Sequence, residues 1–225
     1  MAKKNLKTKG KKRLKKGIFI TFEGPEGSGK STHSKLTADF LRKQGYKVVY
    51  TREPGGTKAG DEIRDVVLNS KKIDISPLTE MLLFEASRAE LVKEVIRPAL
   101  LGKKVVISDR FNAATLVYQG YAGGIPLKDI KRVESVSIKG IKPDLTIILD
   151  IDAEAGLKKV HRGRKDRMES KKLSFHKKVR KGYLDLARDN RKTIKVIRTR
   201  KRKSETFGEI KREVMNVIRR YKPTG

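Results

Sequence analysis

The sequence predicts an α/β protein of three layers, in which helices cover both faces of a parallel sheet of five strands. Short apolar runs alternate with longer segments of helical periodicity along most of the 225 residues, as expected of βαβ units. A glycine-rich segment at 24–29 joins the first apolar run to the first helical segment. The length suits one compact domain, which we expect over residues 18–222, after a separate tail at 1–17.

Strands are expected where short apolar runs are bounded by turn residues, at 18–23, 47–51, 104–108, 145–150 and 193–197. Helices are expected where apolar residues recur with a helical period, at 30–44, 58–68, 77–101, 128–139, 153–161, 170–188 and 204–219. Gly45 and Gly102 each lie where a helix should end and a strand begin. The stretch 161–172 lacks a hydrophobic period, so we expect an exposed, mobile loop there.

A large positive charge distinguishes the composition, because 56 Lys and Arg stand against 26 Asp and Glu, for a net charge of +30. Such a field attracts polyanions, including nucleotides, nucleic acids and acidic membrane surfaces. The first 17 residues contain no acid and are too polar to bury, so we expect a disordered tail. This tail is either a solvated segment or a weak tether to nucleic acid or an anionic surface.

Several kinds of protein are disfavoured by the residues that the chain lacks. It has no cysteine, which excludes disulfides and thiolate metal sites, and His33, His161 and His176 form no zinc pattern. No apolar run approaches the roughly 18 residues that span a bilayer, and the N-terminus lacks the apolar centre of a secretory signal. We therefore expect a cytoplasmic location without membrane insertion.

Residues 24–31, GPEGSGKS, match the phosphate-binding pattern G-x-x-x-x-G-K-[ST] between a predicted strand and a predicted helix. The glycines allow backbone N–H groups to surround phosphate oxygens, and the following helix directs its positive end toward them. In this pattern Lys30 reaches the β and γ phosphates of ATP, and the Ser31 hydroxyl binds Mg²⁺. The predicted ATP-binding residues are Gly24, Pro25, Glu26, Gly27, Ser28, Gly29, Lys30 and Ser31.

A second magnesium-side carboxylate is expected at the end of a neighbouring strand, where ligands collect in open α/β sheets. Asp109 and Asp150 each end a predicted strand. We favour Asp109, because Arg110 follows it and pairs a metal-side carboxylate with a phosphate-side guanidinium. Asp150 is then a simple strand-end acid, an interpretation that the sequence leaves open.

Four further motifs resemble those of the thymidylate kinases in order and spacing: TREPGGT at 51–57, FEASR at 84–88, Asp109-Arg110 and Tyr118-Gln119-Gly120. With the phosphate-binding loop and the basic loop, the resemblance covers essentially the whole chain after the tail. It implies a P-loop NTPase fold, transfer of the γ-phosphate of ATP to dTMP with Mg²⁺, and a homodimer. The nearest alternative is another nucleotide kinase, and the charge leaves open a nucleic-acid-binding P-loop ATPase.

The predicted acceptor site combines cations with an aromatic side chain. Arg52 and Arg110 each lie just beyond a predicted strand end, and the resemblance implies that they bind the doubly charged acceptor phosphate. Phe84 and Arg88 are four residues apart on one predicted helix, so both can point from one face. The resemblance implies that Phe84 stacks on thymine and that Arg88 donates to its O4, although Phe84 alone would equally suit a core. Four more residues belong to this site by resemblance: Glu26, Thr115, Tyr118 and Gln119.

A catalytic arginine is expected in the loop at 161–172. Some thymidylate kinases carry this arginine in the P-loop, where this chain has Gly27. The chain therefore resembles the type whose lid supplies the arginine. Arg167, within Asp166-Arg167-Met168-Glu169, matches best, and Arg162 and Arg164 are the other candidates. The predicted catalytic residues are Lys30, Arg52, Arg110 and Arg167.

Overall fold

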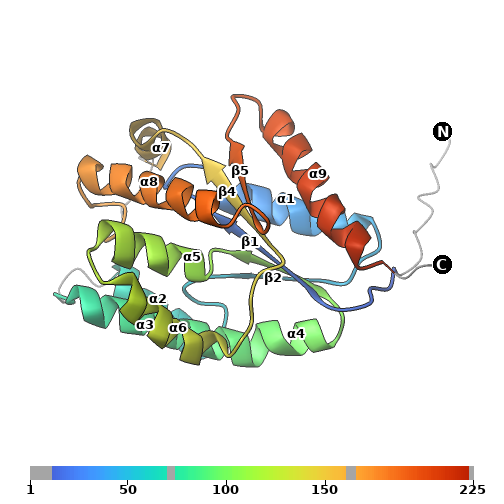
Figure 1. Cartoon of the computed structure of the whole chain (residues 1–225), viewed down its shortest axis with the longest axis horizontal. Coiled ribbons are helices and arrows are strands. Elements are labelled where there is room, and N and C mark those ends of the chain that lie inside the picture. The colour runs from blue at the N-terminus through green and yellow to red at the C-terminus, as the bar shows by residue number, and fades with distance from the viewer. Residues whose placement is uncertain (1–11, 70–73, 161–165, 223–225) are drawn as a thin grey trace, which may run out of the picture.

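The computed structural model describes residues 12–69, 74–160 and 166–222. Five parallel strands form one sheet in the order β2-β3-β1-β4-β5 (Figure 1). The prediction of an α/β fold with a five-stranded parallel sheet is therefore confirmed. Three strands begin one residue later than predicted, and two agree at both ends. The strands are β1 (Ile18–Glu23), β2 (Val48–Arg52), β3 (Val105–Asp109), β4 (Leu145–Asp150) and β5 (Ile194–Arg198).

The central strand β1 pairs with β3 on one side and β4 on the other, and all six of its residues are buried. Its burial on both faces explains why it reads as a nearly continuous apolar run rather than an alternating one. The register places Phe22 of β1 opposite Asp109 of β3, and Arg52 of β2 is the partner of Asp109 on the far side. Because the strands are parallel, the polar residues at their carboxyl ends meet at one edge of the sheet.

Within the part of the chain that the structure describes, helices account for most residues outside the strands, and three π-helical segments extend α-helices. The prediction of single helices at 58–68 and 77–101 is corrected, because each changes its hydrogen bonding along its length. A helical segment over 112–122 was not predicted, since it shows no clear apolar period. The elements are α1 (Lys30–Lys43), α2 (Lys58–Arg64), η1 (Asp65–Asn69), α3 (Pro77–Leu91), η2 (Val92–Ile96), α4 (Arg97–Leu101), α5 (Asn112–Thr115), η3 (Leu116–Ala122), α6 (Leu127–Ile138), α7 (Ala153–Val160), α8 (Leu173–Asp189) and α9 (Lys203–Arg220).

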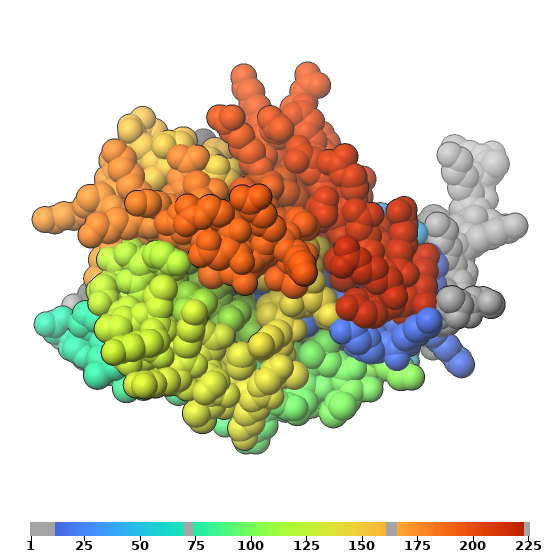
Figure 2. Space-filling model, viewed as in Figure 1, coloured from blue at the N-terminus to red at the C-terminus, as the bar shows by residue number. Residues whose placement is uncertain are grey.

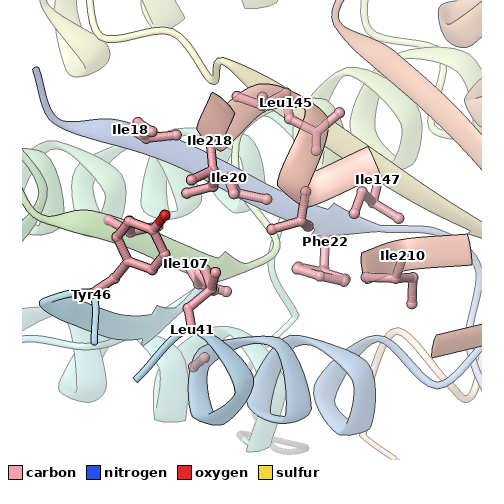
Figure 3. Close-up of a cluster of buried hydrophobic side chains, with 14 of the residues drawn as sticks. Ile18, Ile20, Phe22, Leu41, Tyr46, Ile107, Leu145, Ile147, Ile210 and Ile218 are labelled. Carbon is pink, nitrogen blue, oxygen red and sulfur yellow. The ribbon is translucent and has the colours of Figure 1, made fainter. Parts of the chain in front are cut away.

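Two apolar layers hold the helices against the sheet. On one face, Ile20 and Phe22 of β1 pack with Leu41 of α1 and Ile210 of α9 (Figure 3). On the other face, Phe19 of β1 lies in a cluster supplied by α3, η2 and β3. Successive β1 side chains thus alternate between the two layers, as strand geometry requires. A rigid central strand results, and it carries the phosphate-binding loop at its end.

Residues 12–17 pack against the domain, although the sequence placed them in the tail. Leu14 is 5% exposed within the α1–α9 core, and the backbone N–H of Lys15 donates to the carbonyl of Tyr221. Figure 2 shows this blue segment against the red end of α9. The buried side chain of Leu14 therefore anchors residues 12–17 to the domain, although most residues of this segment are Lys or Arg. Residues 1–11 of the predicted tail lie outside the described residues. None of the helices in the described part of the chain is long and apolar enough to cross a membrane.

Candidate active site

A cleft of about 810 Å³ opens at the carboxyl edge of the sheet. The phosphate-binding loop forms one wall, the residues after β2 and β3 form another, and α3 and η3 close the deep end. Asp109 and Tyr118 both line this cleft. Residues that are far apart in the sequence are therefore gathered where the parallel sheet leaves a crevice.

The loop between β1 and α1 has the backbone of a phosphate cradle. Gly24, Gly27 and Gly29 have φ angles of +134°, +69° and +89°, in the region that favours glycine. Lys30 is buried, and its amine donates to the carbonyl of Pro25 at 2.8 Å. Burial and the charge of Arg110 lower the pKa of Lys30 to about 8. Ser31 is exposed and lines the cleft.

The two strand-end carboxylates have different surroundings. Asp150 receives two hydrogen bonds from Arg180 of α8, at 2.7 and 3.0 Å. Asp109 is 9% exposed and lines the cleft, and within residues 12–69, 74–160 and 166–222 its carboxylate has no hydrogen-bonding or ionic partner. This difference favours Asp109 over Asp150 as a metal ligand.

Arg110 has a left-handed backbone, with φ of +74°, which is rare for a residue other than glycine. The backbone N–H of Arg110 donates to the carbonyl of Phe22, and its carbonyl accepts from the Ser108 hydroxyl at 2.6 Å. The backbone N–H of the following residue, Phe111, donates to the carboxylate of Glu23 at 2.7 Å. These contacts hold the strained conformation. They direct the Arg110 guanidinium into the cleft.

The Glu26 carboxylate joins the phosphate-binding loop to the opposite wall. It accepts from the Arg110 guanidinium and from the Tyr118 hydroxyl, the latter at 2.7 Å. The Lys30 amine lies 3.9 Å away. Burial alone raises the pKa of Glu26, but Arg110 and Lys30 more than offset it and lower the pKa to about 2. The side chain is therefore ionised at neutral pH.

Two more arginines reach the cleft near Arg110. Arg52 is about half exposed, and its nearest acid is Asp61, at 3.7 Å. Arg64, on α2, was not predicted as a site residue. Arg64 lines the cleft and donates to the carbonyl of Pro54 at 2.8 Å. Its pKa is lowered mainly by burial and, to a smaller extent, by the positive charge of Arg52. Its position seven residues after TREPGGT, on the helix that this turn begins, was the signal available in the sequence.

Arg88 lies at the deep end of the cleft and is 2% exposed. It donates to Glu53 at 2.8 Å, to Glu85, to the Phe111 carbonyl and to the Thr115 hydroxyl. Burial lowers its pKa, but the two carboxylates outweigh burial, so the pKa lies above its usual value. The arginine is permanently charged and positioned by four partners.

Phe84 both lines the cleft and packs against the core. The two interpretations of this residue, as a stacking surface for a base and as a core residue, are therefore compatible. It is half-buried and lines the cleft while it packs against the cluster of Val117, Tyr118 and Tyr183. Gln119 is buried beside the cleft and donates to Glu80 at 3.0 Å. The structure therefore brings together the predicted acceptor-site residues from α3, α5 and η3.

Arg167 is not among the residues that line the cleft in this structure. Its guanidinium lies 3.6 Å from Glu80 and donates to the Val67 carbonyl at 3.2 Å, and its backbone N–H donates to the Leu68 carbonyl. The neighbouring Met168 packs in the core, and Asp166 and Glu169 line the cleft. Arg162 and Arg164 lie outside the described residues.

Glu23, the last residue of β1, was also missed. It is fully buried and accepts from the N–H of Phe111 and, at 2.8 Å, from the Tyr183 hydroxyl. Burial raises its pKa to about 7, against the opposing effect of Arg110. An acid at the end of an otherwise apolar buried strand was its signal in the sequence.

No cluster of three or more acidic or histidine side chains within the described ranges is arranged to hold a metal ion by itself. One unpaired carboxylate and one hydroxyl instead fit a cation whose other ligands come from a nucleotide and water, as Mg²⁺ prefers. The fold and the loop between β1 and α1 define a P-loop phosphotransferase, with cations on both sides of one cleft.

Comparisons with known proteins identify the family. The family model described as thymidylate kinase matches residues 22–210. The thymidylate kinase of Thermoanaerobacter sp. (strain X514) is 41% identical over 206 residues, which cover 92% of this chain and 99% of the relative. That of Dehalococcoides mccartyi is 50% identical over 166 residues, covering 74% and 80%. The crystal structure of thymidylate kinase from Ehrlichia chaffeensis superposes with a TM-score of 0.73 at 34% identity, covering 88% of this chain and 98% of that one. The chain belongs to the thymidylate kinase family, as its motifs predicted.

Proposed function

We propose that this chain transfers the γ-phosphoryl group of ATP to dTMP and releases ADP and dTDP. The observation that carries this proposal is the gathering of a phosphate cradle and three arginines, Arg52, Arg64 and Arg110, around one cleft in a member of the thymidylate kinase family. A kinase needs cations for two sets of phosphates, whereas an ATPase needs them for one. The cleft supplies both.

On the donor side, the loop N–H groups and Lys30 bind the ATP phosphates. In this structure, the Lys30 amine donates to the carbonyl of Pro25. When ATP binds, the amine can donate to a charged phosphate oxygen instead, which is a stronger acceptor. Ser31 and Asp109 would hold Mg²⁺. When bound, the ion neutralises charge on the β and γ phosphates. Lys30 stabilises charge that develops on the bridging oxygen, so its effect is on the transition state.

On the acceptor side, Arg52, Arg64 and Arg110 bind the phosphate of dTMP. That phosphate has a second pKa of about 6, so the attacking oxygen is already largely ionised at neutral pH and no protein base is required. Positioning and charge neutralisation then carry the reaction. The ionised Glu26 holds Arg110 in place and is suited to accept a hydrogen bond from the sugar hydroxyl.

The base is bound by Phe84 and Arg88. The half-buried Phe84 ring offers a stacking surface, and Arg88 has one N–H beyond those that its partners occupy. Donation of that N–H to the thymine O4 would distinguish thymine from cytosine, which has an amino group at this position. Thr115, Tyr118 and Gln119 complete the wall around the base and sugar.

The arginine that covers the transferring group comes, in this proposal, from the segment 161–172 rather than from the P-loop. Arg167 is tied to Glu80 and Val67, which supports a role in anchoring this segment. Arg162 and Arg164 are then the candidates for phosphate contact, on sequence grounds. The sequence-based prediction that Arg167 is this arginine stands beside the proposal as the alternative.

We also propose a homodimer. Leu78 and Leu82 lie one turn apart on α3 and are 56% and 46% exposed. A pair of copies that packs these α3 faces together would remove both leucines from water. Analytical ultracentrifugation of Leu82→Lys beside the unchanged chain tests this, because a charge at the centre of such an interface would yield monomers.

ADP release measured with dTMP, dUMP, AMP, CMP, GMP and RNA tests the function. We expect rapid release with dTMP, slower release with dUMP, which lacks the methyl group, and little with the others or with ATP alone. A preference for another monophosphate would replace dTMP as acceptor. Stimulation by RNA with steep salt dependence would instead favour the nucleic-acid-binding ATPase.

A further inference from the structure

Helix α7 lies directly on the phosphate-binding loop through two glycines. A Cβ added to Gly27 would lie 2.0 Å from the carbonyl oxygen of Gly156, and a Cβ added to Gly156 would lie 2.2 Å from the carbonyl oxygen of Glu26. Both distances are far below van der Waals contact. Backbone therefore meets backbone, with no side chain between the loop and the helix.

The geometry points to Gly156 as a positioning residue for phosphoryl transfer, which fixes the loop at Glu26 and Gly27 by allowing α7 to rest on it. This inference rests on the proposed function and adds a residue to it. Gly156 is not among the residues that line the cleft. It acts through the loop backbone, and hence through the residues that the loop presents to the cleft.

The contact acts at the residue that connects the two halves of the site. Glu26 contributes its backbone to the phosphate cradle and its carboxylate to Arg110 and Tyr118 on the acceptor wall. A shift of the Glu26 carbonyl therefore changes the cradle directly and the acceptor wall through an ion pair. A misplacement of about 1 Å can cost on the order of 10²-fold in rate.

The helix is itself firmly held, so it is a fixed support for the loop. The Asp152 carboxylate accepts from the N–H groups of Glu154 and Ala155 at the start of α7, at 3.0 and 3.1 Å. Arg180 of α8 lies 3.8 Å from Asp152 while it binds Asp150. At its other end, α7 contributes Lys159 and Val160 to the cleft.

The same contact explains why position 27 carries no side chain. Its φ of +69° disfavours every residue but glycine, and the Gly156 carbonyl fills the space that a Cβ would need. A cation cannot be placed at this point of the loop unless α7 retreats. This agrees with the proposal that the arginine over the transferring group comes from another segment.

Gly156→Ala tests the inference, with Gly208→Ala as the matched control. Gly208 lies in α9, and a Cβ there would meet nothing within 4 Å. Both changes remove a glycine from a helix, where alanine is favoured by about 1 kcal/mol, so propensity acts alike on the two variants. Steady-state kinetics with ATP and dTMP, calorimetric titration with ADP and with dTMP, and the thermal midpoint are measured for each.

We expect Gly208→Ala to match the unchanged chain within twofold in every assay. Gly156→Ala should lower kcat by about 10- to 100-fold and weaken the binding of ADP at least fivefold, because the added methyl group displaces the phosphate cradle. Its dTMP affinity should fall less than its ADP affinity, since the acceptor wall is reached only through the Glu26 side chain, and Phe84 and Arg88 belong to α3.

Two results would overturn the inference. One is a Gly156→Ala variant with kcat and ADP affinity within twofold of the unchanged chain. The other is loss of its cooperative thermal transition, which would make the contact a requirement of folding instead. If the unchanged chain does not phosphorylate dTMP, the proposed function fails, and the ADP titrations still decide the role of Gly156.

Discussion

Arg180 binds both oxygens of Asp150, at 2.7 and 3.0 Å. The last residue of β4 is thereby neutralised, whereas Asp109, at the same edge of the sheet, faces the cleft. A carboxylate that already has two charge-assisted hydrogen bonds is a poor ligand for a further cation. We therefore expect the two strand-end acids to have separable roles, Asp150 in structure and Asp109 in catalysis.

Asp109→Asn should lower kcat by about 10²-fold and raise the Mg²⁺ concentration needed for half-maximal rate, because a neutral amide replaces the metal-side charge. Asp150→Asn is its matched control. It should lose about 1 kcal/mol of unfolding free energy, since the bond to Arg180 is weakened at a partly exposed site, and keep most of its activity. Magnesium titrations and thermal unfolding measure both effects. A reversed pattern would transfer the metal role to Asp150.

Lys30 should make ADP binding depend on pH. Burial and Arg110 lower the pKa of its amine to about 8, so the amine is charged below this pH and increasingly neutral above it. The charged form attracts phosphate, so ADP affinity should fall as the pH rises from 7 to 9.5. Calorimetric titration across this range measures it.

Lys30→Met is the control for that pH dependence. It keeps an unbranched side chain but has no titrating group, so its weak ADP binding should not change over the same pH range. Its kcat should be lower by about 10²- to 10³-fold, and its thermal midpoint at pH 7 should not fall, because a buried charge has been removed. An identical pH profile for the unchanged chain and Lys30→Met would exclude Lys30 as the titrating group.

Base choice should depend on Arg88, but the alanine variant is not a clean test. Removal of Arg88 leaves Glu53 and Glu85 buried without their cation, which costs about 3–5 kcal/mol. Arg88→Lys keeps the charge and loses the planar fork. We expect this variant to fold and to lose about tenfold of its preference for dTMP over dCMP in kcat/KM. An unchanged preference would mean that Arg88 does not contact the base.

Deletion of residues 2–11 should leave kcat and the thermal midpoint nearly unchanged, whereas deletion of 2–16 should lower the midpoint. The second deletion removes Leu14, which is buried against α9. A buried leucine contributes roughly 2 kcal/mol or more. Filter binding to RNA at low salt, before and after removal of 2–11, tests the weak-tether interpretation of the tail. Unchanged RNA binding would contradict it.

The fold and the donor loop could be predicted from the sequence because their signals are local. The β1 strand is buried on both faces and therefore forms a continuous apolar run, and the glycines after it are required by backbone angles. The segment over 112–122 escaped prediction because packing, rather than an apolar period, makes it helical. Leu14 escaped for a similar reason, since one apolar residue among lysines gives no pattern.

Site residues were missed where their position depends on contacts distant in sequence. Glu23 holds the backbone beside Arg110 by accepting from the N–H of Phe111, 88 residues further along the chain. Arg64 lies at the end of α2, the helix that Thr57 of TREPGGT caps, and lines the cleft from there. The sequence shows that both residues are ionisable, but it does not show that their side chains lie at or beside the cleft.

Arg167 provides the sharpest test of how the segment 161–172 works, because two roles predict opposite results. If Arg167 anchors the segment, its value lies in its contacts with Glu80 and Val67. Arg167→Ala should then lower kcat less than tenfold and reduce the thermal midpoint. If Arg167 stabilises the transferring phosphoryl group, the same change should lower kcat by about 10³- to 10⁵-fold, as loss of an arginine finger does.

Glu80→Gln separates these roles without altering any arginine. Glu80 lies 3.6 Å from Arg167 and is not a lining residue of the cleft, so an anchoring role predicts that Glu80→Gln reproduces the loss seen in Arg167→Ala. The double variant should then lose little more than Arg167→Ala alone, since both changes remove the Arg167–Glu80 contact and only the arginine also donates to Val67. Arg162→Ala combined with Arg164→Ala should carry the large loss in kcat, with little change in the KM for dTMP. A near-normal Glu80→Gln beside an inactive Arg167→Ala would restore Arg167 as the catalytic arginine and overturn the anchoring assignment.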